Sequence, residues 1–463
     1  MLKSFKLAAL LALPAMSSFG QGLSIVRGNV DKSYVTSVHL YKVVDGTFSE
    51  IGVQPLNDKR DYAFAIPDVK EGFYYISDGM KMQEVHTRFY LKGGEQIELN
   101  LHKDGYDLKG ETEEGKLLDK WQQLSAQVMV PAYQFWTDRD GYTGFFPVLT
   151  AFVPQAAAFK KEIHTSNAAF NDLMVFVVDN DLESAALEFI STPRTKHPKW
   201  AELPPFYQTI RQDKKFCDAN ILKLGDGAMN RLSIYTGFCF RSDKEAGIIT
   251  DSMMKKVDFL QRGLSLLCND TVKGAFVITN LRNFRNLADL QTAKASYQQY
   301  LVTDTMKGRL LNYEKDLAAY AKGEKGFNFS YPDLNDQKVS LSDLKGKVVF
   351  VDVWATWCGP CRKELPDLKR LEADMKDKNV AFVSISIDEE KDKDKWKKMV
   401  ADEKLGGIQL FANGWNTDIA KYYKITGIPR FMIFDRQGNI VDSNSPRPSE
   451  PELKKALEKA LMN

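Results

Sequence analysis

The sequence predicts a multidomain chain with an N-terminal antiparallel β domain, a central α-helical region and a C-terminal α/β domain. Three observations carry this prediction. Short strand-like segments fill the first 110 residues, helical apolar periodicity follows, and near residue 354 a buried strand gives way to a helix start. The expected domain boundaries are 21–111, 112–321 and 322–463.

Composition restricts the number of domains and the classes of partner. The 463 residues are 44% hydrophobic and 27% charged, which suits two or three domains with sizeable cores. The 63 basic and 61 acidic side chains leave a net charge of only +2. No general field therefore attracts nucleic acid or acidic membranes, and neither is an expected partner.

The first twenty residues resemble a cleaved export signal. Lys3 and Lys6 precede the apolar run Leu7–Leu13, and Ser18 and Gly20 are small residues at the positions that a signal peptidase reads. The run is shorter than the ~20 residues needed to span a bilayer, and no cysteine follows it to carry a lipid. We expect residues 1–20 to be removed and the mature protein to be soluble in a bacterial periplasm.

The N-terminal domain is expected to consist of short strands separated by turn signals such as Asp45-Gly46 and Gly93-Gly94. The expected strands are Leu23–Arg27, Val35–Val43, Tyr62–Ile66, Gly72–Ser77, Val85–Leu91 and Gln96–Leu101. No chemical constellation is visible among them. Three histidines there are interpreted as surface or strand residues and not as ligands: His39, His86 and His102.

The central region shows apolar residues at helical spacing, which indicates core-facing helices. The stripes are Leu117, Trp121, Leu124 and Val128, and Met306, Leu310, Tyr313, Leu317 and Tyr320. Prolines at 193, 198, 204 and 205 divide the region into helical hairpins. The polar, Gly-bearing segment 321–326 predicts a hinge before the last domain.

Three cysteines of the central region, Cys217, Cys239 and Cys268, are an odd set for an oxidising compartment. Their neighbours are apolar, so we interpret them as buried thiols. A disulfide that leaves one cysteine free, and a second redox centre, are the alternatives.

The motif Cys358-Gly359-Pro360-Cys361 decides the chemistry. The apolar run Val348–Trp354 predicts a buried strand, and Cys358 then falls at the N-terminus of the next helix. Backbone N–H groups and the helix dipole favour a thiolate there, so Cys358 is the expected nucleophile. Cys361, at i+3 on the same helical face, is the expected resolving thiol.

A metal site is the first alternative for this motif. A structural zinc needs about four ligands, but the chain has no second CxxC and no histidine after position 197. We therefore expect no metal. Asp352 stands inside the apolar strand, where an ionised carboxylate is costly, and is expected to act as an acid or base.

Four segments together resemble the thioredoxins, and among them the exported thiol:disulfide interchange proteins related to cytochrome c biogenesis reductases. They are Phe327–Phe329, Val339–Lys347, Val351–Cys358 and Thr426–Pro429. The resemblance covers about the last 140 residues and implies a thioredoxin fold.

The resemblance also implies roles for single residues. Asp352 matches the buried acid that assists proton transfer, and Glu364 matches an active-site glutamate, although a helix dipole alone also favours a glutamate there. Ile428 and Pro429 match a cis-proline loop that binds substrate. Trp357, Gly359 and Pro360 complete the expected substrate-binding set, with core packing as the alternative for Trp357.

The sequence thus predicts a periplasmic thiol-disulfide oxidoreductase that reduces protein disulfides and needs no cofactor beyond the Cys358/Cys361 dithiol. Gly-Pro between the cysteines is the thioredoxin choice and favours reduction. A membrane thiol-disulfide transporter is the expected electron donor.

Two other classes of protein are the alternatives. A peroxiredoxin would place a threonine three residues before its cysteine, whereas Thr356 is two before Cys358. The second is a partner- or ligand-binding envelope protein in which the dithiol only regulates or tethers, because over 300 residues lie outside the redox domain.

Overall fold

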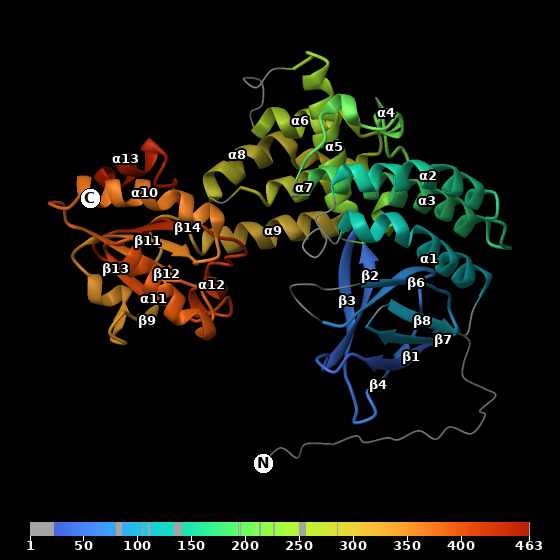
Figure 1. The fold of residues 1–463 in the computed structure, drawn as a ribbon, viewed down its shortest axis with the longest axis horizontal. Helices are drawn as coiled ribbons and strands as arrows, with labels where there is room; N and C mark the ends of the chain where they lie inside the picture. The colour runs from blue at the N-terminus through green and yellow to red at the C-terminus, as the bar shows by residue number, and fades with distance from the viewer. Residues whose placement is uncertain are drawn as a thin grey trace. The chain divides into compact units, whose positions relative to one another are not determined.

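A computed structural model describes residues 23–79, 86–103, 105–109, 112–133, 141–192, 194, 196–212, 214–225, 227–249, 256–284 and 286–462. The chain divides into two compact units, residues 1–277 and 278–463. Figure 1 labels the helices and strands along the chain. The predicted export signal at 1–20 lies outside the described residues. No helix among the described residues is long and apolar enough to cross a membrane.

The first unit opens with two four-stranded sheets, ordered β4-β1-β7-β8 and β3-β2-β5-β6. The strands are β1 (Ser24–Asp31), β2 (Ser37–Val44), β3 (Thr47–Pro55), β4 (Asp61–Ile66), β5 (Gly72–Ser77), β6 (His86–Leu91), β7 (Gln96–His102) and β8 (Gly105–Lys109). Inward-facing residues of both sheets share one core, which includes Val26 and Leu99 from one sheet and Leu40 and Phe89 from the other. The β domain predicted from the sequence is confirmed.

Two details of this domain differ from the prediction. β1 and β7 pair in parallel, although the other pairs are antiparallel. Only consecutive strands joined by a tight turn must run antiparallel, and β1 and β7 are far apart in the chain. Strands β3 and β8 were also missed, because most of their residues are exposed or half-buried and give no apolar alternation.

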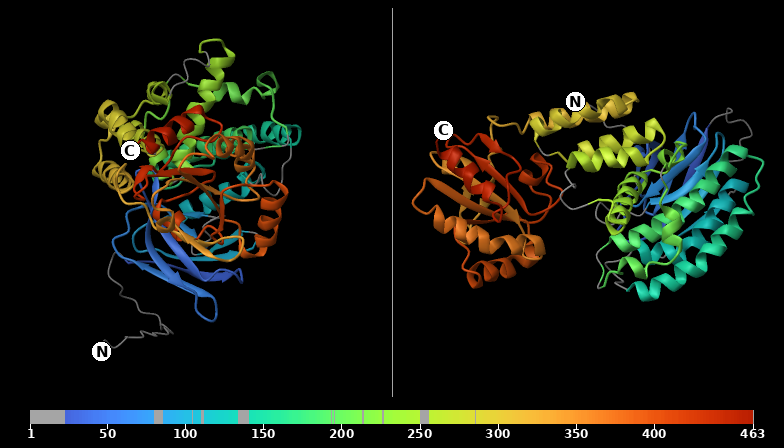
Figure 2. Two further views of the ribbon diagram at one scale, coloured as in Figure 1. Left: turned by 90° about the vertical axis from the view of Figure 1, so that its left-hand side faces the viewer. Right: turned by 90° about the horizontal axis from the view of Figure 1, so that it is seen from above.

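The helices of the first unit follow these sheets. They are α1 (Glu113–Tyr133), α2 (Tyr142–Lys160), α3 (Ala168–Ser191), α4 (Phe206–Ile210), α5 (Gly227–Glu245), α6 (Lys256–Leu266) and α7 (Asp270–Leu281), which crosses the boundary between the units. Helices α1, α2 and α3 lie side by side (Figure 2). Trp121 and Val128 of the predicted stripe on α1 are fully buried.

The cysteines of this unit correct the favoured interpretation. Cys217 and Cys268 form a disulfide, and Cys239 is free and buried. The disulfide joins two segments that also pair through their backbones, since Lys215 N–H donates to Leu266 O at 2.9 Å and Cys268 N–H to Lys215 O at 3.0 Å. Apolar neighbours in the sequence could not reveal this pairing, because the two cysteines are 51 residues apart.

The second unit begins with α8 (Leu287–Tyr297) and α9 (Asp304–Ala318) and continues into a five-stranded sheet ordered β13-β12-β11-β14-β15. The strands are β11 (Val348–Trp354), β12 (Val380–Ser386), β13 (Ile408–Phe411), β14 (Arg430–Phe434) and β15 (Ile440–Asp442), preceded by a hairpin of β9 (Ser330–Pro332) and β10 (Lys338–Ser340). The helices are α10 (Gly359–Asp374), α11 (Lys393–Asp402), α12 (Asp418–Tyr422) and α13 (Pro451–Leu461).

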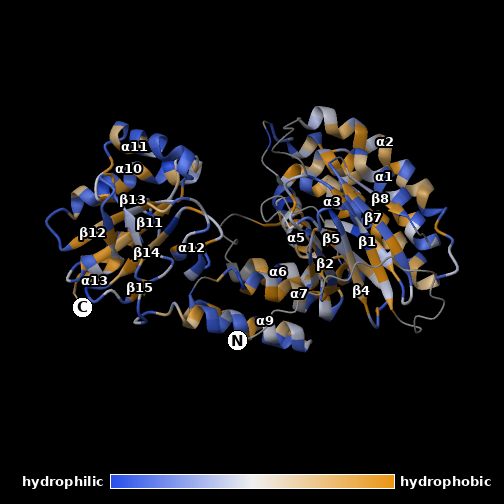
Figure 3. Cartoon of the chain, turned by 90° about the horizontal axis from the view of Figure 1, so that it is seen from below, coloured by the Kyte–Doolittle hydropathy of each residue, from blue (hydrophilic) through white to orange (hydrophobic). Residues whose placement is uncertain are grey.

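Alternate residues of the fully buried strand β11 point to opposite faces of this sheet. Val348 and Phe350 pack with Leu368 of α10 and Leu457 of α13 on one face. Val349, Val351 and Val353 of β11, with Trp396 of α11, belong to the core of the other face. Figure 3 shows β12 as largely hydrophobic and α11 as largely hydrophilic, as expected of a central strand and a covering helix.

The segment predicted as a hinge is held against this sheet. Gly323 N–H donates to Ile440 O at 2.7 Å, Ile440 N–H donates to Glu324 O at 2.7 Å, and Gly326 N–H donates to Gly438 O at 3.0 Å. The hinge interpretation is therefore wrong for residues 323–326, which extend the sheet beyond β15. Polar, Gly-bearing composition favours a loop but does not exclude backbone pairing with a sheet edge.

Candidate active site

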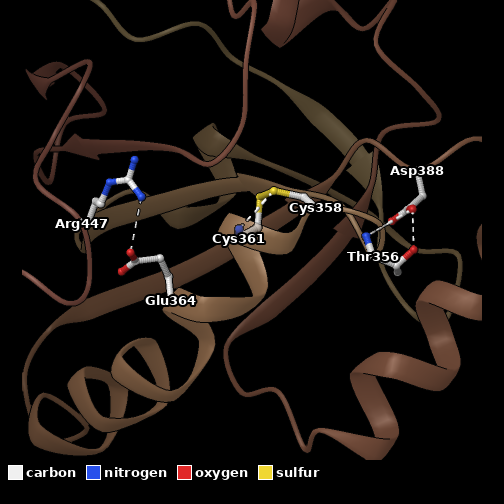
Figure 4. Close-up of a disulfide and its surroundings, with 6 residues drawn as sticks. All are labelled: Thr356, Cys358, Cys361, Glu364, Asp388 and Arg447. Atoms are coloured by element: carbon white, nitrogen blue, oxygen red, sulfur yellow. Dashed lines mark hydrogen bonds and ion pairs between the residues drawn. A yellow bond between two sulfur atoms is a disulfide. The ribbon is translucent and has the colours of Figure 1, made fainter. Parts of the chain in front are cut away.

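The dithiol motif lies where β11 gives way to α10, as predicted. β11 ends at Trp354, Cys358 is the N-cap of α10, and Pro360 occupies the first turn, where its missing N–H costs no helical hydrogen bond. Cys358 and Cys361 form a disulfide with their Cα atoms 5.3 Å apart (Figure 4). The N–H of Cys361 donates to Cys358 Sγ at 3.1 Å.

Both sulfurs are well covered in this oxidised form, since Cys358 is 4% and Cys361 is 3% exposed. Exposure thus does not distinguish the two cysteines. Their positions do: Sγ of Cys358 caps the helix and accepts a backbone N–H, whereas Cys361 lies within the first turn. A thiolate at Cys358 would be stabilised by that N–H and by the helix dipole.

Asp352 lies at the centre of β11 and is buried. Its Oδ1 atom has no hydrogen-bond partner among the described residues. Burial, and secondarily the charges of Glu364 and Glu372, raise the pKa of Asp352 to about 8. A carboxyl group with a pKa near neutrality can both take up and release a proton at physiological pH.

Glu364 lies one turn after Cys361 and is also buried, but its carboxylate has partners. It accepts hydrogen bonds from the backbone N–H of Ser449 at 3.0 Å and from Ser449 Oγ at 3.2 Å. Arg447 approaches it to 3.5 Å (Figure 4). The loop before α13 therefore holds Glu364, a contact that the sequence did not indicate.

The expected substrate-binding residues lie at the same end of β11. The Ile428–Pro429 peptide bond is cis, which confirms the predicted conformation. β14 pairs antiparallel with β11, and the pair Arg430–Val353 places Pro429 next to the end of β11. Ile428 packs against the core that includes both cysteines.

Three further members of that set lie at the surface. Gly359 and Pro360 are exposed. Trp357 is 52% exposed, so it is not a core residue, and its ring centroid lies 6.3 Å from that of Trp415. No group of three or more potential metal-binding side chains occurs among the described residues.

Comparisons with known proteins agree with this geometry. The model of the Redoxin family matches residues 321–460. The thioredoxin-like protein YneN of Bacillus subtilis is 30% identical over 148 residues, which cover 32% of this chain and 84% of YneN. Thiol-disulfide oxidoreductase ResA of Bacillus cereus is 31% identical over 137 residues, covering 30% of this chain and 77% of ResA. The chain belongs to the thioredoxin-like thiol-disulfide oxidoreductases.

Among solved structures, a putative thiol-disulfide oxidoreductase from Bacteroides vulgatus is 47% identical, with 29% of this chain and 87% of that chain covered and a TM-score of 0.27. All these matches cover about a third of this oxidoreductase, and the family match corresponds to its C-terminal part. The fold class and the enzyme class predicted from the sequence are confirmed.

Two residues of the oxidoreductase site escaped sequence reasoning, namely Ser449, which holds Glu364, and Asp388. Asp388 is fully buried and accepts hydrogen bonds from Thr356, two residues before Cys358 (Figure 4). A signal was present: Asp388 follows the apolar run of β12, and parallel neighbouring strands end at one edge of a sheet. The sequence does not reveal that β12 pairs with β11, and without this pairing Asp388 cannot be assigned to the dithiol site.

Proposed function

We propose that this oxidoreductase reduces protein disulfides through Cys358 and Cys361. The observation that carries the proposal is the position of Cys358 Sγ, which caps α10 and accepts the N–H of Cys361. This arrangement lowers the cost of a thiolate at the sulfur that must attack.

In the proposed reaction the Cys358 thiolate attacks one sulfur of the substrate disulfide, and the other substrate sulfur leaves as a thiolate that takes up a proton. Cys361, once deprotonated, attacks the Cys358 sulfur of the mixed disulfide. The Cys358–Cys361 disulfide forms and the second substrate thiol leaves, so two electrons and two protons pass from the enzyme to the substrate.

Asp352 is proposed to take the proton from Cys361. Its raised pKa and its Oδ1 atom without a hydrogen-bond partner among the described residues suit an acceptor that works near neutral pH. Glu364 is proposed to act through its charge, because its oxygens are engaged by Ser449 and because that charge is one cause of the raised pKa of Asp352.

The substrate peptide is proposed to lie along Ile428 and Pro429, with Trp357, Gly359 and Pro360 on the exposed surface beside the dithiol. Proline has no N–H of its own, so the backbone of Ile428 is left free to pair with an extended peptide. No cofactor other than the redox-active cysteine pair is required.

We further place this activity in the bacterial periplasm, on the strength of the signal-like segment 1–20. A reductant in an oxidising compartment must be re-reduced after each turnover. A membrane thiol-disulfide transporter is the proposed electron donor, because it can carry electrons across the membrane.

Insulin reduction tests the proposal. The full chain is expected to reduce insulin in the presence of dithiothreitol, and Cys358→Ser is expected to lower the rate to background. Cys239→Ala, which alters the free buried cysteine of the other unit, serves as the control and should retain wild-type activity. Wild-type activity in Cys358→Ser would refute the proposed mechanism. In addition, Cys361→Ala should accumulate substrates as mixed disulfides on Cys358.

A further inference from the structure

Asp388 is a fully buried carboxylate at the carboxyl end of β12, in the sheet that carries the dithiol. β11 and β12 are parallel, and their register ends with the pair Trp354–Ser386. The loops that follow the two strands therefore leave the sheet side by side. Ile387 N–H donates to Trp354 O at 2.9 Å and continues this pairing into the loops.

Every hydrogen-bond partner of the Asp388 carboxylate is a donor. The backbone N–H of Thr356 lies 2.9 and 3.2 Å from its two oxygens, Thr356 Oγ1 donates at 2.8 Å, and Ser386 Oγ donates at 2.7 Å. Such an arrangement suits the ionised form, which only accepts. Within the part of the chain that the structure describes, Asp388 forms no ion pair, so its charge is balanced by neutral dipoles alone.

The backbone of Asp388 also bonds to the segment that carries Trp415, whose ring lies near that of Trp357. The carbonyl of Asp388 accepts the N–H of Gly414 at 2.9 Å. Gly414 directly precedes Trp415, and Thr356 directly precedes Trp357. One residue thus anchors both segments whose tryptophan rings are in contact beside the dithiol.

From these contacts we propose that Asp388 is a positioning residue, which fixes the Ala355–Trp357 loop and, as a buried anion bonded to Thr356 two residues before the nucleophile, makes the Cys358/Cys361 pair more reducing. The inference rests on the proposed function of this pair. A nearby anion disfavours the Cys358 thiolate and opposes the helix dipole. A less stabilised thiolate means a less stabilised reduced form and hence a stronger reductant.

The other charged groups around the dithiol lie on different elements from Asp388. Asp352 lies within β11, and Glu364 lies on α10 with Arg447 beside it. Arg362 and Lys363, also on α10, are exposed. Within the described ranges, none of these side chains hydrogen-bonds to the loop that precedes Cys358. Glu389 provides a matched control, because it carries the same charge one residue further along and its side chain is 65% exposed.

The test uses the reduced full-length protein. Alkylation of Cys358 by iodoacetamide, followed by mass spectrometry across a pH series, gives the pKa of its thiol. Asp388→Asn is expected to lower this pKa by about one unit, the size expected when one nearby buried charge is lost at an effective dielectric constant of ~20. At pH 8 the equilibrium with glutathione should shift about tenfold toward the dithiol. Glu389→Gln should leave both quantities unchanged, because solvent screens its charge.

Two outcomes would overturn the inference. One is an Asp388→Asn protein that titrates like the wild type or like Glu389→Gln. The other is failure of both Asp388→Asn and the smaller Asp388→Ser to fold, by circular dichroism, since Asp388 would then serve the fold alone. A wild-type protein that does not exchange with glutathione at all would instead refute the proposed function.

Discussion

Three buried carboxylates lie on β11, on α10 and in the loop after β12, and they differ in their hydrogen-bond donors. Glu364 is held by Ser449, and Asp388 is held by Thr356 and Ser386. Oδ1 of Asp352 has no partner among the described residues. Since a buried carboxylate without donors favours its protonated form, Asp352 is the one of the three suited to exchange a proton.

Replacement of Asp352 by asparagine tests this assignment. Asparagine keeps the size of the side chain but accepts no proton, so release of the mixed disulfide should slow about 10²-fold at pH 7. The wild-type rate should rise with pH up to about 8, the pKa of Asp352, and this rise should vanish in the variant. Single-turnover reduction of a disulfide peptide measures both effects. Asp374→Asn, an exposed acid paired with Lys454, is the control.

The same substitution should change the pH dependence of stability. Burial raises the pKa of Asp352 from 3.8 to about 8, so between these pH values the folded chain keeps a proton that the unfolded chain has released. Wild-type stability therefore falls as pH rises through this window, and Asp352→Asn should be the more stable protein at pH 8, by roughly 3–5 kcal/mol. Urea unfolding at pH 5 and pH 8 checks the sign. An equal effect at both pH values would contradict it.

At the scale of elements, the success of the predictions followed the strength of the local signals. The run Val348–Trp354 coincides with β11, and the helix start after Cys358 coincides with α10, because continuous apolar residues and a proline in the first turn act locally. The edge strand β3 was missed because its residues are all exposed or half-buried, unlike those of the edge strand β4, in which Tyr62 and Phe64 are buried. The partners of the site, Asp388 and Ser449, were missed because they approach it from distant parts of the chain.

The pairing of residues 323–326 with β15 leads to a prediction about Gly326. A Cβ atom on Gly326 would lie 2.6 Å from Gly438 O and 2.7 Å from the Phe434 ring, so Gly326→Ala must displace backbone and should destabilise this unit by about 1–3 kcal/mol. Gly308→Ala, in α9 of the same unit, meets nothing within 4 Å and should stabilise by roughly 0.5–1 kcal/mol. Urea unfolding of both variants measures the difference. Equal effects would mean that the 323–326 pairing is absent in solution.

At the scale of the whole molecule, the proposed redox pair and the other cysteines lie in different compact units. The second unit holds Cys358 and Cys361, whereas the first holds the Cys217–Cys268 disulfide and the buried Cys239. Burial raises the pKa of the Cys239 thiol, which makes it a poor nucleophile.

The Cys217–Cys268 disulfide should stabilise the first unit by restricting its unfolded chain. Closure of a loop of this length, 51 residues in sequence separation, corresponds to ~4 kcal/mol, so the double variant Cys217→Ser/Cys268→Ser should lose about that much. Calorimetry should show a lower melting temperature for the first unit, with insulin reduction by the second unit unchanged. A thiol assay on the denatured oxidised protein should find one free thiol, and three would show that this disulfide does not form.

The backbone pairing of residues 323–326 has a consequence for the sheet that they extend. Without them β15 would be an open edge, and an open strand edge invites pairing with another molecule. Residues 323–326 cover this edge at Ile440, so we expect a redox domain begun after Gly326 to associate with itself more readily.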